Sequence, residues 1–326
     1  MSLDADAIVD RRRMRRKLTF WRVLTVLVAI VAIGGAAAMS RHVLDLGGSA
    51  EGTIARIQIT GLIRGNQERV EALERLGKSR ARAVIVHVDS PGGTTAGSEQ
   101  LHDALLALKA QKPMVVVVDG LAASGGYLAS LASDHIVAQS ASLVGSIGVL
   151  FQYPNVAELL GKVGVKVEEV KSSPLKAAPN GFEPTSPEAR AALAAIVTDS
   201  YDWFKSLVKE SRKLDDEALA RVTDGRVFTG RQALALKLVD EIGNEKTALA
   251  WLAKEKNVDP KSPVRDYPLR SRFGDFAFLH VAASALFDAM GLTSIARYLE
   301  ESGTLQGIER LNLDGLLALW HPSSGN

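Results

Sequence analysis

The stretch Met114-Val-Val-Val-Val-Asp-Gly-Leu-Ala-Ala-Ser-Gly-Gly-Tyr127 decides the fold. Its first five residues form a continuous apolar run, which is typical of a strand buried on both faces of a parallel sheet. The run ends in a glycine-rich turn and then becomes helical in pattern, so Ser124 is expected at a strand-to-helix corner. A helix N-terminus favours negative charge there, and glycine lets backbone N–H groups approach a ligand closely. The stretch therefore predicts a central strand with a candidate site at its carboxyl end.

The sequence before this stretch repeats the same rhythm. Ala83-Val-Ile-Val-His-Val88 is a second apolar run, and it leads directly into the glycine turn Asp89-Ser-Pro-Gly-Gly93. A helical pattern over Ser98–Lys109 separates the two runs, while Ile54–Thr60 alternates as a strand and Asn66–Leu76 has helical spacing. Strands that alternate with helices predict an α/β fold with a parallel sheet and right-handed crossovers.

Further elements are expected downstream. Val165–Lys171 reads as a probable strand, and Thr185-Ser-Pro-Glu188 has the spacing of a capping box that opens a long helix. Thr229-Gly-Arg-Gln232 begins another helix, and the chain is apolar and helical in pattern from Phe273 to Trp320. The long helix carries an apolar stripe at 3.6-residue spacing, formed by Leu193, Ile196, Val197, Tyr201, Phe204 and Leu207.

The N-terminal region has the pattern of a membrane anchor. No charged residue falls between Arg22 and Arg41, and this uncharged run is about long enough to cross a bilayer. Basic residues cluster on its N-terminal side, so by the positive-inside rule that end stays in the cytoplasm and the body lies outside. A cleaved signal peptide is the alternative, with Ala36-Ala-Ala38 as a small-residue cleavage site.

Composition excludes several classes of protein and site. The 326 residues are 47% hydrophobic and 23% charged, which is ample for a packed core. Residues 1–40 carry seven Lys/Arg and three Asp, so the rest of the chain has a net charge of only −2, unlike a nucleic-acid binder. No cysteine is present, which rules out disulfides, thiolate metal sites and a cysteine nucleophile.

Ser124 needs a general base if it is a nucleophile rather than a helix N-cap. None of the six histidines (His42, His87, His102, His135, His280 and His321) has an obvious aspartate-linked setting in the sequence. A lysine kept neutral by desolvation is the other possibility, and the residues alone do not separate Lys162, Lys166, Lys171 and Lys176. The N–H of Gly125 and one from Gly92 or Gly93 are candidate oxyanion donors.

Four motifs in order resemble the serine–lysine peptidases of family S49, which include the signal peptide peptidases and protease IV. They are Asp89-Ser-Pro-Gly-Gly93, Ala123-Ser-Gly-Gly-Tyr127, Val144-Gly-Ser-Ile-Gly-Val149, and Lys176 shortly before Ser186-Pro-Glu188. The similarity covers about residues 52–245, and the single catalytic unit behind an anchor resembles the short bacterial form. Val144 stands where the family usually has threonine, and Pro174 lies in the segment that precedes the lysine.

The resemblance implies a role for each site residue. Ser124 would be the nucleophile, Lys176 the general base, and Ser146 the residue that orients the lysine. Gly125 and the Gly92–Gly93 turn would supply the oxyanion donors, and neither metal nor cofactor is expected. The implied fold is a Clp-protease/crotonase-like stack of ββα units.

The resemblance also implies partners and a location. Short forms assemble as membrane-mounted homo-oligomeric rings, with an octamer expected here, and serine and lysine come from neighbouring subunits. The expected substrates are remnant signal peptides in extended conformation, and the expected location is the cytoplasmic membrane with the catalytic domain on its outer side.

The sequence thus predicts five segments. A cytoplasmic N-terminus (1–22), a single transmembrane anchor (23–40) and a linker (41–52) precede the peptidase domain (53–250), and a mostly helical extension (251–326) follows it. Two other functions fit the glycine turns. Acyl-CoA chemistry on a crotonase fold is disfavoured because coenzyme A is cytoplasmic, and a non-catalytic scaffold ring would tolerate alanine at both dyad positions.

Overall fold

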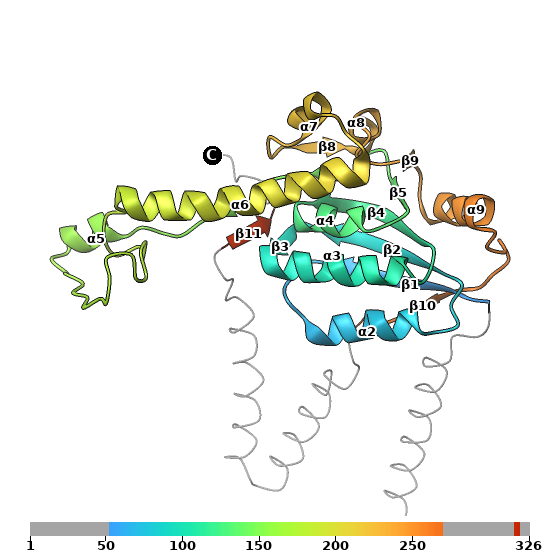
Figure 1. The fold of residues 1–326 in the computed structure, drawn as a ribbon, viewed down its shortest axis with the longest axis horizontal. Coiled ribbons are helices and arrows are strands. Elements are labelled where there is room, and N and C mark those ends of the chain that lie inside the picture. The colour runs from blue at the N-terminus through green and yellow to red at the C-terminus, as the bar shows by residue number, and fades with distance from the viewer. Residues whose placement is uncertain (1–51, 270–315, 320–326) are drawn as a thin grey trace, which may run out of the picture. The chain divides into compact units, whose positions relative to one another are not determined.

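Residues 52–269 and 316–319 are described by the structure, a computed structural model, and they form a mixed α/β unit around a largely parallel sheet (Figure 1). The main sheet has the order β10-β1-β2-β4-β5-β9, with β6 paired to β4 and β8 paired to β6. All pairings are parallel except β6 with β8. The strands are β1 (Ile54–Thr60), β2 (Ala83–Ser90), β4 (Met114–Ala123), β5 (His135–Ala138), β6 (Leu143–Gly145), β8 (Val227–Thr229), β9 (Glu241–Ile242) and β10 (Val264–Asp266).

The two apolar runs are central strands with both faces buried, as the sequence predicts. Val84, Val86 and Val88 of β2 pack in the larger core cluster with helices on one face of the sheet, whereas Ile85 packs in a second cluster on the other face. Alternate side chains of a strand point to opposite faces, so a continuous apolar run is needed when both faces are covered.

Helices cover the two faces unequally. The larger core cluster takes side chains from α2 (Gln67–Gly77), α3 (Thr95–Lys109), α4 (Gly125–Leu131) and the second half of α6 (Pro187–Arg212), whereas α9 (Glu245–Lys256) packs on the opposite face. The remaining described helices are α5 (Ala157–Lys162), α7 (Asp216–Val222) and α8 (Gly230–Ala235). The helix predicted to begin at Thr229-Gly-Arg-Gln232 is α8, and a capping box between Thr229 and Gln232 opens it.

A second, three-stranded sheet lies beside the main one. β3 (Gly92–Thr94) comes from the glycine turn that follows β2, β7 is Leu150–Phe151, and β11 (Leu316–Leu319) pairs antiparallel with both of them. A C-terminal segment therefore lies in extended conformation between two strands that belong to the middle of the chain (Figure 1).

Three expectations about local structure are wrong. Val165–Lys171 is not a strand, since it forms no ladder with another segment of the described chain. The N-cap of α6 is Ser186, which accepts from the Ala189 N–H, while Thr185 instead contacts the Tyr153 hydroxyl, so no capping box forms. The body also continues past residue 250, because α9 crosses that position and β10 pairs with β1.

The other terminal predictions fall mostly on residues that the structure does not describe. The anchor at residues 23–40 and the helical pattern from Phe273 lie outside the described ranges, apart from Leu316–Leu319, which is a strand rather than a helix. Within residues 52–269 and 316–319, every helix is too short or too polar to cross a bilayer.

Candidate active site

Ser124 lies at the corner between β4 and α4, as the sequence predicts. It is fully buried, and its backbone has φ 52° and ψ −117°, a conformation that residues other than glycine rarely adopt. Although Ser124 occupies the N-cap position of α4, its side chain caps no N–H of the helix. The hydroxyl is therefore not used as a helix cap, which was the alternative to a nucleophile.

The first turn of α4 touches the loop that follows β2. A Cβ added at Gly126 would lie 2.7 Å from the Ser90 carbonyl oxygen, so only glycine permits this approach. The buried Ser90 hydroxyl donates to the Gly61 carbonyl at 2.7 Å and accepts from the Gly92 N–H at 3.1 Å. Ser90 and Gly126 thus bring together the two glycine turns that the sequence predicts. The sequence itself indicates no role for either residue.

The Gly92–Gly93 turn presents one backbone N–H toward β11. Gly92 has φ 101°, and a Cβ at Gly93 would lie 1.7 Å from the Ile63 carbonyl oxygen. Ile63 bonds the Gly92 carbonyl and the Thr94 N–H, so the N–H and C=O of Gly93 itself point to the opposite side, where β11 pairs with β3. Because the Gly92 N–H is bonded to Ser90, the candidate donor of this turn is the Gly93 N–H, which faces β11.

Residues 145–148 enclose Ser124 from another direction. The Ser124 N–H donates to the Gly145 carbonyl at 2.7 Å, and its Oγ lies 3.5 Å from the Gly148 carbonyl oxygen. Ser146 is buried in the left-handed region with φ 50°, and its N–H donates to the Arg226 carbonyl. Val144, the departure from the family pattern, is buried in β6 and contributes to the core.

Lys176 is not brought to Ser124 within one chain. Its side chain is exposed, in a segment without regular structure, and this side chain makes no hydrogen bond or ion pair with any residue that the structure describes. Lys171 is a poorer base, because hydrogen bonds from its ammonium group to Glu169 and Glu183 raise its pKa above the ordinary value. A raised pKa keeps a lysine charged, whereas a general base must be neutral.

Three of the histidines do have carboxylate neighbours, contrary to expectation. His87 contacts Asp119 and Glu245, while His102 and His135 lie near Asp103 and Glu241. The sequence could not show this, because Asp119 and Glu245 are 32 and 158 residues away from His87. None of these rings bonds Ser124, so a Ser-His-Asp arrangement does not form in the described part of the chain.

Comparison with known proteins decides the family. The model of peptidase family S49 matches residues 106–259. A relative from Synechocystis sp. that carries a protease name is 37% identical over 209 residues, which are 64% of this chain and 76% of the relative. The chain belongs to peptidase family S49.

Other similarities of this S49 chain are more partial. A relative from Enterococcus faecium named as signal peptide peptidase SppA is 33% identical over 195 residues, 59% of this chain and 57% of that protein. Among solved structures, a mutant of ClpP1 from Listeria monocytogenes aligns with a TM-score of 0.38 at 17% identity, over 58% of this chain and 91% of that one. The α/β class with a parallel sheet is confirmed by the strand pairing itself, and the ββα stack stays a prediction.

The S49 chain therefore brings most, but not all, of the predicted site residues together. Ser124, Gly125, Ser146 and the Gly92–Gly93 turn meet at the carboxyl ends of β2, β4 and β6, whereas the Lys176 side chain lies apart from them, unbonded to any described residue. The described residues hold no cluster of three or more His, Asp or Glu side chains arranged to bind a metal ion.

Proposed function

We propose that this S49 peptidase is a serine endopeptidase in which Ser124 is the nucleophile and Lys176 the general base. The observation that carries the proposal is the buried Ser124 hydroxyl, which caps no N–H of α4 and lies at the start of a helix whose first turn packs on Ser90, just before the Gly92–Gly93 turn. Two backbone donors that converge beside a nucleophile suit a tetrahedral oxyanion, and each is typically worth about 2.7–4 kcal/mol in the transition state.

The chemistry follows from these positions. Neutral Lys176 takes the hydroxyl proton while Ser124 Oγ attacks the scissile carbonyl carbon, and the carbonyl oxygen gains the negative charge that Gly125 and Gly93 stabilise. The C–N bond then breaks as the lysine returns the proton to the leaving amine, which gives an acyl-enzyme. Water attacks the ester with the same lysine as base, and Ser146 holds the lysine in line.

An extended peptide is the substrate that the surroundings of Ser124 suit. β11 pairs antiparallel with β3 through Leu317–Thr94, Ala318–Gly93 and Leu319–Gly92, and with β7 on its other side. The slot between β3 and β7 therefore accommodates a strand, and main-chain bonds to both sides would hold a peptide with little dependence on its side chains. An acyl-CoA thioester has no backbone that could form such a ladder.

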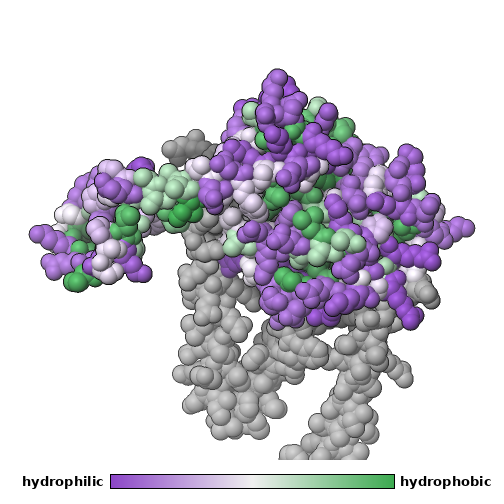
Figure 2. Space-filling model, viewed as in Figure 1, coloured by the Kyte–Doolittle hydropathy of each residue, from purple (hydrophilic) through white to green (hydrophobic). Residues whose placement is uncertain are grey.

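The lysine is proposed to come from a second copy of the chain. Of the eleven large apolar side chains exposed among the described residues, eight lie between Leu159 and Ile196, around Lys176. Figure 2 shows such residues interspersed with polar ones over α5 and the first half of α6. Exposed apolar groups in this number favour burial against a partner, and a homo-oligomeric ring, proposed as an octamer, would place this segment beside a neighbour's Ser124.

The substrate pool is proposed to be remnant signal peptides. The basic and apolar sequence of residues 11–40 would anchor the ring in the cytoplasmic membrane with the peptidase domain on its outer side. Released signal peptides are apolar and stay in the same bilayer, and the Enterococcus faecium relative carries the name of such an enzyme.

The test is hydrolysis of an apolar peptide by the purified full-length protein in detergent. Ser124→Ala and Lys176→Ala should each lower kcat by roughly three orders of magnitude or more, because each removes a group that moves in the reaction. Lys166→Ala removes another exposed lysine of the same segment and should keep full activity. Retained turnover in Ser124→Ala sinks the serine assignment, and loss in Lys171→Ala alone would move the base to Lys171.

A further inference from the structure

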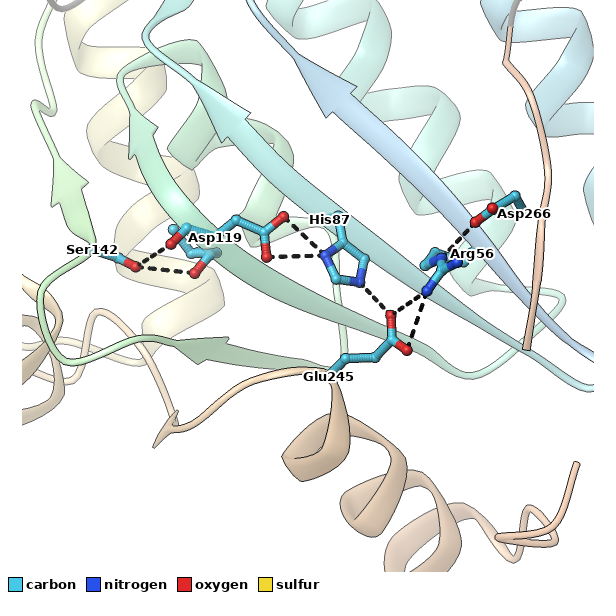
Figure 3. Close-up of polar contacts among 7 residues, drawn as sticks. Arg56, His87, Asp119, Ser142, Glu245 and Asp266 are labelled. Atoms are coloured by element: carbon cyan, nitrogen blue, oxygen red, sulfur yellow. Dashed lines mark hydrogen bonds and ion pairs between the residues drawn. The ribbon is translucent and has the colours of Figure 1, made fainter. Parts of the chain in front are cut away.

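A network of charged side chains lies on the face of the sheet that α9 covers, beneath the candidate site (Figure 3). His87 of β2 is at its centre. The ring Nδ1 lies 3.0 and 2.9 Å from the two carboxylate oxygens of Asp119, and Nε2 lies 2.8 Å from Glu245 Oε2. Glu245 is also bonded by Arg56, which in turn bonds Asp266.

The His87 ring lies between two carboxylates, one at each ring nitrogen. An ionised carboxylate only accepts hydrogen bonds, so the ring donates an N–H to at least one of them and lies within hydrogen-bond distance of the other. The His87 side chain is 16% exposed and that of Glu245 26%, so water competes weakly for these bonds, whereas Asp119 is 43% exposed. Burial raises the pKa of the Glu245 carboxyl, but hydrogen bonds from Arg56 and His87 outweigh it and leave the pKa below its ordinary value.

The bond from His87 to Asp119 spans a break in the ladder between β2 and β4. Val88 pairs with Val118, but the next pair is Ser90 with Ala122, so three residues of β4, 119–121, lie opposite the single residue Asp89. The Ser142 hydroxyl donates to the Val118 and Asp119 carbonyls at this bulge. The backbones of β2 and β4 are not paired at these residues, so the bond between the His87 and Asp119 side chains links the two strands.

What lies beyond the bulge is the site itself. β2 continues from Asp89 to Ser90 and the Gly92–Gly93 turn, and β4 continues through Ala122 to Ser124. A bulge beside an active site sets the direction in which the following residues point. A shift in register at residues 119–121 would move the Ser124 hydroxyl relative to the Gly93 N–H, because only two residues separate Leu121 from Ser124.

We propose that His87, in contact with both Asp119 and Glu245, is a positioning residue that fixes the register of this bulge and so the place of Ser124 against the oxyanion turn. The proposal rests on the nucleophilic role of Ser124. Loss of the ring would remove the link between β2 and Asp119. The charged groups around the ring are Asp119 of β4, Glu245 of α9, Arg56 of β1, Asp266 of β10, and Asp89 further along β2.

The test is the separate measurement of kcat and KM for the full-length protein and its variants in detergent. His87→Gln should lower kcat about tenfold or more with little change in KM, because the peptide slot between β3 and β7 is not part of the network. Asp119→Asn should also lower kcat at an unchanged KM, because an amide is a weaker acceptor than a carboxylate for the ring N–H.

His135→Gln is the matched control. His135 also lies on a strand of the sheet and faces a carboxylate, Glu241, but it stacks on Trp251 at the far side of β5. It should leave kcat unchanged even if thermal stability falls. If His87→Gln does not fold, Asp119→Asn decides, because that side chain is nearly half exposed.

The outcomes separate two failures. A kcat equal to that of the parent in both His87→Gln and Asp119→Asn overturns the positioning role, provided that Ser124→Ala is inactive. Activity retained in Ser124→Ala would instead overturn the proposed function on which this inference rests.

Discussion

At the scale of single residues, glycine decides how closely the parts of the site approach. Gly93 and Gly126 each stand where a Cβ would meet a backbone oxygen, at 1.7 Å from Ile63 and 2.7 Å from Ser90. These backbone oxygens cannot move aside as a flexible side chain can. The Gly126 contact therefore fixes the distance between α4 and Ser90 at the end of β2, and the Gly93 contact fixes the distance between the glycine turn and Ile63. The donors Gly93 and Gly125 keep their spacing through these two contacts.

Gly126→Ala tests this spacing. The added methyl group would push the first turn of α4 away from Ser90, so we expect kcat to fall about tenfold or more and stability by about 1–3 kcal/mol. Turnover and thermal unfolding of the variant provide the measurement. Gly161→Ala in α5, where an added Cβ meets nothing within 4 Å, should leave kcat unchanged; a normal kcat in Gly126→Ala would show that the close approach is dispensable.

The same scale shows what the sequence could and could not reveal. The motif Ser124-Gly-Gly126 after an apolar run was sufficient to predict the corner, because local pattern and backbone geometry coincide there. The partners of His87 could not be predicted, since they come from β4 and α9 and depend on a bulge that has no sequence signal of its own. The two glutamate partners of Lys171 could not be predicted either, because no local pattern places Glu169 and Glu183 beside its ammonium group.

At the scale of elements, one partly buried ion pair joins α6 to the edge of the sheet. Arg212 donates to both carboxylate oxygens of Asp240, at 3.1 and 2.6 Å, and to the Lys237 carbonyl, while Asp240 accepts from the Ile136 N–H of β5. Burial raises the pKa of the Asp240 carboxyl, but the hydrogen bonds and charge of Arg212 outweigh it and hold the pKa below its ordinary value. A lowered carboxyl pKa stabilises the fold above the unfolded pKa near ~4, and this stability is lost as pH falls through the folded value.

Arg212→Met should therefore destabilise the fold by about 2–3 kcal/mol at pH 7, because it leaves a half-buried carboxylate unpaired. The loss of stability should be smaller near pH 3, because the parent has already lost part of the stability that the ionised Asp240 carboxyl contributes. Thermal unfolding of the parent and the variant at both pH values measures this loss. Arg221→Met breaks an exposed i,i+4 pair on α7 and should change stability by less than about 0.5 kcal/mol; equal losses in the two variants would contradict this account.

β11 is an element whose conformation the sequence predicts wrongly. Leu316-Leu-Ala-Leu319 ends an apolar region that reads as helical, and its extended form depends on the exposed edges of β3 and β7, which local propensity does not contain. Because the segment occupies the proposed peptide slot, it should compete with substrate.

Removal of residues 316–326 should lower the KM of an apolar peptide several-fold and leave kcat nearly unchanged. A tethered strand competes at an effective concentration in the millimolar range, and the deletion relieves this competition. Steady-state kinetics give KM and kcat for the shortened chain and for the full-length chain, and the two sets of values are compared. An unchanged KM would indicate that β11 does not hinder substrate, and a higher KM would indicate that it helps to bind it.

At the scale of the whole molecule, the separation of Ser124 from Lys176 is the decisive feature. The nucleophile is buried in the body, and the lysine side chain, which has no partner among the described residues, lies in a segment rich in exposed apolar groups. The proposed assembly of identical chains would solve both problems, because it would cover the apolar segment and give each serine a lysine. The family resemblance implies this arrangement, whereas no pattern within one chain shows which surface meets a neighbour.

The most direct measurement is therefore activity in mixed assemblies. Ser124→Ala and Lys176→Ala chains, each inactive alone, are dissociated, mixed in equal amounts and reassembled, and peptide hydrolysis is compared with parent protein treated identically. If every site combines the serine of one chain with the lysine of its neighbour, about a quarter of the sites regain both groups, and about a quarter of the parent activity should return. Mixtures that stay as inactive as the single variants, in assemblies shown to contain both chains, would contradict the shared dyad.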